Sequence, residues 1–506
     1  MARRRRESEP RTLFHGGVIL PRFEEVMNYL CLGIIGSGKS LTSRAHWLGS
    51  LSRIKRPIGR EQVGGIIFDF KKDALPYTAS IVGPERIHVL NPFYGGSELS
   101  SAIDFAATFE TESQIFQLAT ALFPGGENEA QKFWSQSGQD LIAATIFVFS
   151  ILAPGRWDLR DVIEALASLD RIKLVLRQLT STRFLIDIYL TTEVTTKNIH
   201  ASIRANAREF RPVAAVSHRI QRKLRIADFV KNLNEVLVLQ LDYSKLVASR
   251  AVQRLITQML FEHLLDLDDS EDRRVFGFFD EIQELGPLPL LDTLLSTGRS
   301  KGICTFLYTQ SLNGLYLAYG KEATHKFLTN IPTRAFFASA DETAEWISAQ
   351  LGNLEVKGLM KSRNGIDEPE KPEHKQIRNI SVLTASEISR LLPPSPSRGL
   401  RGIYTSRLTK PFFSNLYGLD VRLPKPMPGI AASVKRAASD EVLEPWTQAD
   451  LERLGLRLGP DDDLEKILGI VPEPIVSHPV PELPAPGAPD ESIRGKLSDI
   501  FKGFRK

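Results

Sequence analysis

The chain is poor in cysteine and contains no long apolar run. Its two cysteines, Cys31 and Cys304, fall inside stretches predicted to be buried strands, so we interpret them as small core residues in a reducing compartment and not as a disulfide or a metal pair. The longest apolar stretch, Leu141–Ala153, is shorter than the roughly 20 residues that a membrane helix needs. We interpret it as a buried core helix.

A secretory signal is absent as well. The first residues include a run of arginines, Arg3–Arg6, but no apolar segment follows it. Since neither a signal nor a membrane-spanning run is recognisable, we expect the chain to be cytoplasmic. Any attachment to a membrane is then expected to come from a partner.

The sequence also lacks a large excess of one charge. The formal net charge of +4 is too small to indicate a nucleic-acid partner, so the placement of the charges has to decide that question. The hydrophobic fraction of 42% and the charged fraction of 25% are ordinary for a globular protein. A chain of 506 residues is long enough for two or three domains with a sizeable core.

The most informative stretch fits the pattern G-x-x-x-x-G-K-[ST], which starts at Gly33 and ends at Ser40. A short apolar run precedes it and helical spacing follows it, as in a phosphate-binding loop between a strand and a helix. The N–H groups of such a loop face phosphate oxygens, Lys39 reaches the β and γ phosphates, and the Ser40 hydroxyl ligates Mg²⁺. The alternative is a glycine-rich turn that binds nothing. The predicted nucleotide-binding residues are Gly33, Gly36, Ser37, Gly38, Lys39, Ser40 and Leu41.

An acidic partner for this loop follows a second apolar run, Val275–Phe279, which is typical of a strand buried on both faces of a parallel sheet. The run ends in Asp280 and Glu281, where open α/β sheets bind their ligands. We expect Asp280 to hold Mg²⁺ and Glu281 to polarise the attacking water. The alternative is a pair of acids that ends a strand and starts a helix.

The apolar pattern divides the chain into five parts. Strand and helix patterns alternate at first, which predicts an α/β fold with a parallel sheet, and a long helical stretch then interrupts them. We expect a disordered basic N-terminus (1–11), the first part of a nucleotide-binding domain (12–112), an all-α insertion (113–232), the second part of the nucleotide-binding domain (233–423), and a disordered Pro-rich linker with a basic amphipathic tail (424–506).

Basic residues concentrate in the insertion. The segment Lys197–Lys231 holds nine lysines and arginines but only two acids, Glu209 and Asp228. Such a stripe suits a DNA backbone, which is bound without regard to sequence; a solvated helical face is the alternative. The candidate DNA-binding residues are Lys197, Arg204, Arg208, Arg211, Arg219, Arg222 and Lys223.

Several features, taken in order, resemble one family. After the phosphate-binding loop come Asp69 at a strand end, the helical insertion, and the pair Asp280 and Glu281. The pattern Gly298-Arg299-x-x-Gly302 follows, and then a strand that ends in Thr309-Gln310-Ser311. Over roughly residues 16–410 the chain is similar to the coupling proteins of type IV secretion, the conjugation DNA pumps of the TraD, TrwB and TraG kind that are related to FtsK and HerA.

The resemblance implies a RecA-like P-loop motor that hydrolyses ATP with Mg²⁺ and translocates DNA as a homo-hexameric ring. It implies catalytic roles for Lys39 and Glu281. Arg299 matches an arginine near a neighbouring subunit's γ-phosphate, although a helix-end salt bridge is the alternative, and Gln310 matches a polar sensor beside the P-loop strand. The insertion corresponds to a domain of the family associated with DNA and relaxosome binding.

The resemblance also implies the partners: DNA, relaxase or effector proteins, proteins of the secretion channel, and further copies of the chain. Family members usually begin with a transmembrane hairpin, which this chain leaves no room for before its P-loop. We therefore expect peripheral attachment to the inner membrane through a partner, or a soluble motor. Two alternatives remain open: a nucleotide-dependent recruitment platform that does not pump, and a soluble HerA-like motor in repair or defence.

Overall fold

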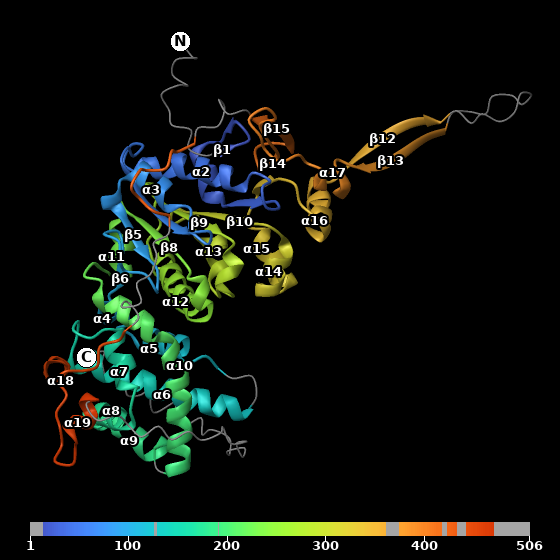
Figure 1. Cartoon of the computed structure of the whole chain (residues 1–506). Helices are drawn as coiled ribbons and strands as arrows, with labels where there is room; N and C mark the ends of the chain where they lie inside the picture. The colour runs from blue at the N-terminus through green and yellow to red at the C-terminus, as the bar shows by residue number, and fades with distance from the viewer. Residues whose placement is uncertain are drawn as a thin grey trace, which may run out of the picture. The chain divides into compact units, whose positions relative to one another are not determined.

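The computed structural model describes residues 14–125, 129–190, 192–360, 374–416, 423–432 and 442–469 (Figure 1). The chain divides into two compact units, each assembled from segments that are distant in the sequence. The first unit contains Met1–Arg86, Leu233–Val236 and Leu264–Ala432, and the second contains Ile87–Asn232, Leu237–His263 and Ser433–Lys506. The expected N-terminal arm (1–11) lies outside the described residues.

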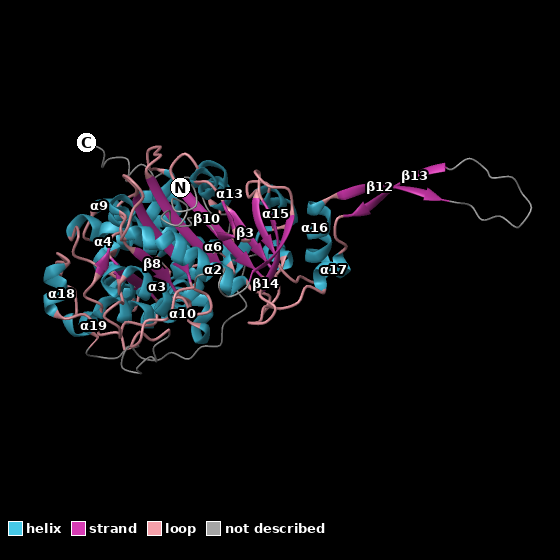
Figure 2. Cartoon of the chain, turned by 90° about the horizontal axis from the view of Figure 1, so that it is seen from above, coloured by secondary structure: helices cyan, strands magenta, loops and turns pink. Residues whose placement is uncertain are grey.

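The largest sheet has nine strands in the order β15-β14-β11-β3-β10-β9-β4-β8-β5. Strands are drawn in magenta in Figure 2. Strand pairing is parallel for β10 with β3, β10 with β9, β11 with β3 and β4 with β9. It is antiparallel for β14 with β11 and for β14 with β15. The predicted α/β fold with a mostly parallel sheet is therefore confirmed. Its strands are β3 (Tyr29–Leu32), β4 (Gln62–Phe68), β5 (Ile87–Leu90), β8 (Val236–Leu239), β9 (Arg273–Asp280), β10 (Ile303–Thr309), β11 (Thr333–Phe336), β14 (Leu400–Thr405) and β15 (Phe412–Leu416).

The central strands are apolar because both faces of the sheet are covered. Every residue of β3 and β10 is buried, as expected for parallel strands between layers of helices. The register sets Leu32 beside Thr309 and Tyr308 beside Asp280. The carboxyl ends of β3, β10 and β9 therefore lie side by side, and the loops that follow these strands meet at one edge of the sheet.

The helices of the first unit follow its strands in the chain. The longest, α2, starts at Lys39, directly after the glycine-rich loop, and carries eight buried residues. α16 starts at Asp341 with two acidic residues in its first turn, a favourable charge at a helix N-terminus. The helices are α2 (Lys39–Leu51), α3 (Leu75–Val82), α13 (Leu291–Thr297), α14 (Leu312–Tyr319), α15 (Lys321–Leu328), α16 (Asp341–Leu351) and α17 (Ala385–Ser389).

An antiparallel hairpin follows α16. Its strands, β12 (Asn353–Met360) and β13 (His374–Ser381), pair from Asn353 with Ser381 to Met360 with His374. The range Lys357–Gln376 is polar in sequence, and the hairpin takes part of it. A two-stranded ladder needs no apolar core of its own to satisfy its inner backbone groups, which explains why the hydrophobic pattern gave no signal.

The second unit is mainly helical. Several of its helices begin at capping residues: the side chains of Thr111 and Asp158 accept hydrogen bonds from the N–H groups of Gln114 and Asp161, and both form reciprocal capping boxes. The helices of this unit are α4 (Phe105–Thr108), α5 (Glu112–Leu122), α6 (Glu129–Leu152), α7 (Leu159–Ala165), α8 (Leu169–Leu176), α9 (Thr180–Tyr189), α10 (Glu193–Arg219), α11 (Ile226–Asn232), α12 (Leu246–Leu265), α18 (Gln448–Arg453) and α19 (Leu464–Leu468). Two short strands, β6 (Ala102–Ile103) and β7 (Lys223–Leu224), pair in parallel beside them.

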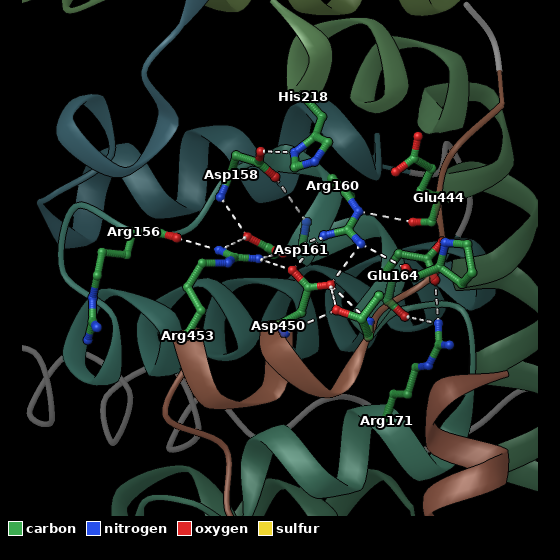
Figure 3. Close-up of polar contacts among 12 residues, drawn as sticks. Arg156, Asp158, Arg160, Asp161, Glu164, Arg171, His218, Glu444, Asp450 and Arg453 are labelled. Carbon is green, nitrogen blue, oxygen red and sulfur yellow. Dashed lines mark hydrogen bonds and ion pairs between the residues drawn. The ribbon is translucent and has the colours of Figure 1, made fainter. Parts of the chain in front are cut away.

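Part of the C-terminal region is folded. From the composition we expected no structured element after residue 424, but residues 442–469, here called the C-terminal clasp, carry α18 and α19. Trp446 of the clasp is only 2% exposed, and its ring lies 6.3 Å from that of Phe149 in α6. The polar contacts of the clasp join it to α7 and α8 (Figure 3). The Pro-rich stretch and the amphipathic end lie outside the described residues.

Two further expectations concern apolar residues. Cys31 and Cys304 are both free and buried in strands, and burial raises the pKa of the Cys31 thiol to about 12, so this sulfur stays protonated. Among the described residues, no helix combines the length and the hydropathy needed to cross a membrane.

Candidate nucleotide-binding site

The glycine-rich loop joins β3 to α2 and is fastened to the ends of the neighbouring strands. The Gly33 N–H donates to the Thr309 carbonyl at 3.3 Å, and the Ile34 N–H donates to the Ala338 carbonyl at 2.7 Å. These two bonds fix the start of the loop to the last residue of β10 and to the chain that follows β11. The loop is therefore anchored from both sides at the edge where the strands end.

Two glycines are required by close approach. A Cβ atom on Gly33 would lie 2.5 Å from the Ser37 Oγ, and one on Gly38 would lie 2.3 Å from the Leu400 Cδ1. Gly38 also has a φ of +122°, a conformation that side-chain-bearing residues rarely adopt. The tight curl of the backbone that a phosphate needs is thus available only to glycine here.

Lys39 lies over the loop it follows. Its Nζ donates to the carbonyl oxygens of Gly33 and Ile34, the latter at 3.2 Å. Burial lowers the pKa of the Lys39 ammonium, and the charge of Glu281 opposes that effect. The Ser37 Oγ is buried and has no hydrogen-bond partner within the described residues. A phosphate group in the loop would offer acceptors to both side chains, so the donors of this loop fit that ligand.

The acidic pair stands at the end of β9 with an unusual backbone. Glu281 has φ +57° and ψ +57° and is 2% exposed. Its Oε2 accepts the Gln310 N–H at 3.2 Å and the Gln283 Nε2–H at 2.6 Å, whereas its Oε1 is buried without a partner in the part of the chain that is described. A left-handed conformation at a residue with a side chain costs on the order of 1–3 kcal/mol and is common in functional sites. One carboxylate oxygen therefore remains available to a ligand or water.

Asp280 is paired with a lysine that our sequence interpretation did not assign to the site. The Lys71 Nζ lies 3.0 Å from the Asp280 Oδ2 and 3.2 Å from its Oδ1. Burial raises the pKa of Asp280, and Lys71 only partly offsets this effect. Burial alone would lower the pKa of Lys71, but the Asp280 carboxylate outweighs burial and raises it. The signal in the sequence was the position of Lys71, just after the strand β4 that pairs with β9.

The two residues predicted to hold magnesium line one small pocket. Ser40 and Asp280 both face it, together with Asp69 and Asp73. The Asp69 carboxylate accepts N–H groups of Asp73 and Ala74 at 3.0 and 3.1 Å, so it orders the turn after β4. A hydroxyl and a carboxylate in one pocket are the oxygen ligands that Mg²⁺ takes, and the residues present fit that ion.

The remaining site residues divide between two ends of the sheet. Leu41 lies in the first turn of α2, and Gln310 touches Glu281 through its backbone. Arg299 lies in the exposed turn before β10, at the opposite end of that strand from Gln310. The structure therefore brings Gln310, Lys39, Ser40, Asp280 and Glu281 together, and it does not bring Arg299 to them within one chain.

The basic segment of α10 is only partly exposed. Lys197, Arg204 and Arg208 are exposed on this helix, and Lys197 pairs with Glu193 at 2.5 Å. Arg211, half-buried, pairs with Glu164 at 3.2 Å. The spacing of these basic residues along the helix places them on one face.

The last three candidates bind the chain itself. Arg219 donates to the Val442 carbonyl at 2.9 Å, Arg222 donates to the Ile87 carbonyl at 2.6 Å, and Lys223 donates to the Ser217 carbonyl at 2.6 Å. Arg219, Arg222 and Lys223 therefore have a structural role in the second unit. Whether any of the basic residues contacts DNA stays a prediction.

Comparisons with known proteins agree with this picture. Residues 12–401 match the sequence model of a family described as "Type IV secretion-system coupling protein DNA-binding domain". The chain is 23% identical over 348 residues to the coupling protein TraD of Escherichia coli (strain K12), which covers 67% of this chain and 46% of TraD. It is 27% identical over 154 residues to the conjugal transfer protein TraG of Rhizobium radiobacter, or 30% of this chain and 24% of TraG. The chain thus spans less than half the length of these curated relatives.

Solved structures show the same fold. The unbound monoclinic form of the conjugative coupling protein TrwBdeltaN70 matches with a TM-score of 0.64 and 18% identity, covering 85% of this chain and 92% of that one. TrwB in complex with ADP and Mg²⁺ matches with a TM-score of 0.63 and 17% identity, covering 85% and 94% of the two chains. Because the family match extends over well more than half of the sequence, the chain belongs to the type IV secretion-system coupling protein family.

Proposed function

We propose that this protein binds ATP with Mg²⁺ and hydrolyses it to drive DNA translocation. The observation that carries the proposal is the meeting of Lys39, Ser40, Asp280 and Glu281 at one edge of the sheet, with buried polar atoms that have no partner among the described residues. The family membership and the relative bound to ADP and Mg²⁺ support the same reading.

Each residue of the site has a separate task in this mechanism. The Lys39 ammonium moves from the loop carbonyls to the β and γ phosphates, and the loop N–H groups hold the phosphate oxygens. Ser40 and Asp280 would hold the magnesium ion, which would neutralise charge on the phosphates. The free Oε1 of Glu281 orients the attacking water and accepts its proton, while the Gln310 and Gln283 bonds to Oε2 keep the carboxylate in place.

DNA binding is assigned to the exposed face of α10. Lys197, Arg204 and Arg208 lie along that face and suit successive phosphates, and such contacts release cations without reading bases. The family description names a DNA-binding domain, which supports the same partner.

Arg299 is proposed to act on a neighbouring copy. An arginine that contacts the γ-phosphate speeds phosphoryl transfer by about 10³–10⁵. Arg299 lies at the end of β10 opposite the P-loop edge of its own copy. A ring of copies, hexameric in this proposal, would place Arg299 of one copy at the site of the next. Relaxase or effector proteins and the secretion channel are the proposed further partners.

The ATPase rate with and without DNA tests the proposal. The wild-type protein is expected to hydrolyse ATP, and its ATPase rate is expected to rise when double-stranded DNA is added. The Lys39→Ala variant is expected to lose hydrolysis, because the phosphates no longer meet the positive charge of the lysine. A matched control is Lys55→Ala, which removes an exposed lysine outside the site. Nucleotide binding without any DNA-stimulated turnover would favour a recruitment platform instead.

A further inference from the structure

Lys71 is a cation of the site that the proposed mechanism does not use. It lies in the turn after β4, three residues past Phe68, and its Nζ contacts both carboxylate oxygens of Asp280. Its side chain is 34% exposed, and that of Asp280 is 21% exposed. The pair therefore sits at the mouth of the site, where a side chain can move without disturbing the core.

The ammonium of Lys71 holds the carboxylate that Mg²⁺ needs. Asp280 shares a pocket with Ser40, so a metal ion bound there approaches the same oxygens that Lys71 contacts. Because two cations beside one carboxylate repel each other, Lys71 and a metal ion compete for Asp280. Lys39 does not compete in this way, since its Nζ donates to loop carbonyls.

The turn around Lys71 is fixed while its side chain is free to swing. The Lys72 N–H donates to the Asp69 carbonyl at 3.3 Å, and the Asp69 carboxylate accepts the Asp73 N–H. These bonds hold the backbone at the edge of the P-loop. A lysine has a long flexible stem, so its ammonium can move from Asp280 toward a phosphate without moving the turn.

We propose that Lys71 is a positioning residue that occupies Asp280 in the nucleotide-free protein and releases it only when Mg²⁺ arrives together with a nucleoside triphosphate. The released ammonium then pairs with the triphosphate. This inference rests on the proposed nucleotide function. Its consequence is that the empty site excludes a divalent cation alone, so that metal and nucleotide enter as a pair.

The inference is tested by Mn²⁺ binding to the nucleotide-free protein. Electron paramagnetic resonance measures the concentration of free Mn²⁺ in each sample. Wild-type protein and the Lys71→Arg variant are expected to bind Mn²⁺ weakly, because both keep a cation on Asp280. Lys71→Ala is expected to bind it at least about tenfold more tightly, and the added Asp280→Asn substitution is expected to remove that gain. Lys55→Ala is the matched control and should behave as the wild type.

The second measurement uses the loaded site. With Mg²⁺ and ATP both saturating, Lys71→Ala is expected to lower kcat by about tenfold or more, while Lys71→Arg retains most of it. The inference is overturned if Lys71→Ala, folded by circular dichroism, binds Mn²⁺ no better than the wild type, or if Lys71→Arg behaves like the alanine variant. A wild-type protein that binds no nucleotide would overturn the proposed function instead, and the Mn²⁺ result would still stand by itself.

Discussion

At the scale of the residue, Glu281 has a strained backbone and a carboxylate of which only one oxygen accepts hydrogen bonds within the described residues. Its left-handed φ of +57° turns the chain directly after β9, and the turn aims the buried carboxylate toward the Gln310 backbone. One oxygen is held and the other has no partner among the described residues. This arrangement fixes the direction of the free oxygen, which is what a water-positioning group requires.

Replacing Glu281 by glutamine tests that role. The Glu281→Gln variant is expected to bind ATP as the wild type does, because the phosphate contacts are unchanged, and to lower kcat by about 10²–10⁴, because the amide cannot accept the proton. Equilibrium binding of a fluorescent nucleotide and a phosphate-release assay separate the two effects. Glu271→Gln, an exposed acid just before β9, is the control and should keep the wild-type rate. Wild-type turnover in Glu281→Gln would remove this residue from the mechanism.

At the scale of the element, α10 directs some of its basic residues to solvent and others into contacts with the chain itself. The helix buries a continuous stripe that includes Ile199, Ile203 and Phe210, so the opposite side carries Arg204 and Arg208 outward. Segments beyond its C-terminus turn their basic side chains toward backbone carbonyls instead. Net charge along a segment thus overstates the charge that a DNA partner can reach.

Charge reversal on α10 tests the exposed face. Arg204→Glu combined with Arg208→Glu is expected to weaken DNA binding and to reduce the slope of log affinity against log salt by about 2 or more, because at least two fewer cations are released. ATPase activity without DNA should persist. The measurement is fluorescence anisotropy with a DNA duplex at several salt concentrations. Unchanged affinity and an unchanged slope would remove this face from the DNA-binding surface.

Arg222→Glu is the contrasting variant for the same helix region. Its guanidinium donates to the Ile87 carbonyl, so charge reversal leaves that carbonyl without this partner and places a partly buried carboxylate beside it. We expect a loss of about 1–3 kcal/mol of folding free energy, measured by chemical denaturation, with little specific effect on the salt slope.

The sequence predicted the fold and part of the site because both depend on local patterns. The P-loop residues follow from the spacing of Gly33 and Lys39, and the acid pair from the end of an apolar strand. Lys71 was missed because its contact with Asp280 joins residues 209 positions apart, and the clasp was missed because its apolar residues are scattered among prolines and acids. Long-range contacts of this kind leave no periodic signal in the sequence.

At the scale of the whole molecule, the C-terminal clasp completes the second unit. Arg453 donates to both oxygens of Asp161 at 2.7 and 2.9 Å, and Arg160 donates to both oxygens of Asp450 at 3.0 Å, so each side of the interface supplies one arginine and one acid (Figure 3). Trp446 of the clasp is buried as well. The clasp and α7 are therefore joined by two reciprocal Arg–Asp ion pairs.

Substitutions in the clasp test its contribution to stability. Trp446→Ala is expected to cost about 3–5 kcal/mol, since a nearly buried indole leaves a cavity. The measurement is urea denaturation followed by circular dichroism. Val442→Ala, a residue that is 61% exposed, is the control and should change the free energy of unfolding by less than about 0.5 kcal/mol. Equal stability of the two variants would show that the clasp is not part of the folded unit.

These ion pairs predict that the folding stability depends on pH. Burial alone would raise the pKa of Asp450, but hydrogen bonds from Arg160 and Arg453 outweigh it and hold the pKa well below its ordinary value. A lowered pKa in the folded state contributes stability that is complete above the ordinary value near 3.9 and is lost as the pH falls below it. Asp450→Asn should therefore reduce stability at pH 7 and flatten the loss between about pH 4 and pH 2, measured by denaturation at each pH.

Mixed rings test the action of Arg299 between copies. Arg299→Ala and Lys39→Ala are each expected to be inactive alone, whereas mixing them should restore part of the activity, because some interfaces then join an intact Lys39 site to an intact Arg299. The readout is ATPase rate against mixing ratio, with size-exclusion chromatography to establish co-assembly. Co-assembled mixtures without recovery would place Arg299 elsewhere.

The discontinuous second unit has a consequence for biosynthesis. The ribosome has finished the helical part of this unit once it has passed His263. The clasp that contacts Phe149 and Asp161 begins only at Val442. At about 5–20 residues per second, the ribosome needs roughly 10–40 s to make the intervening chain. During that interval the apolar surface that the clasp later covers is exposed on the nascent helices, which makes them a substrate for chaperones. The last native contacts to form are those between the middle and the end of the polypeptide.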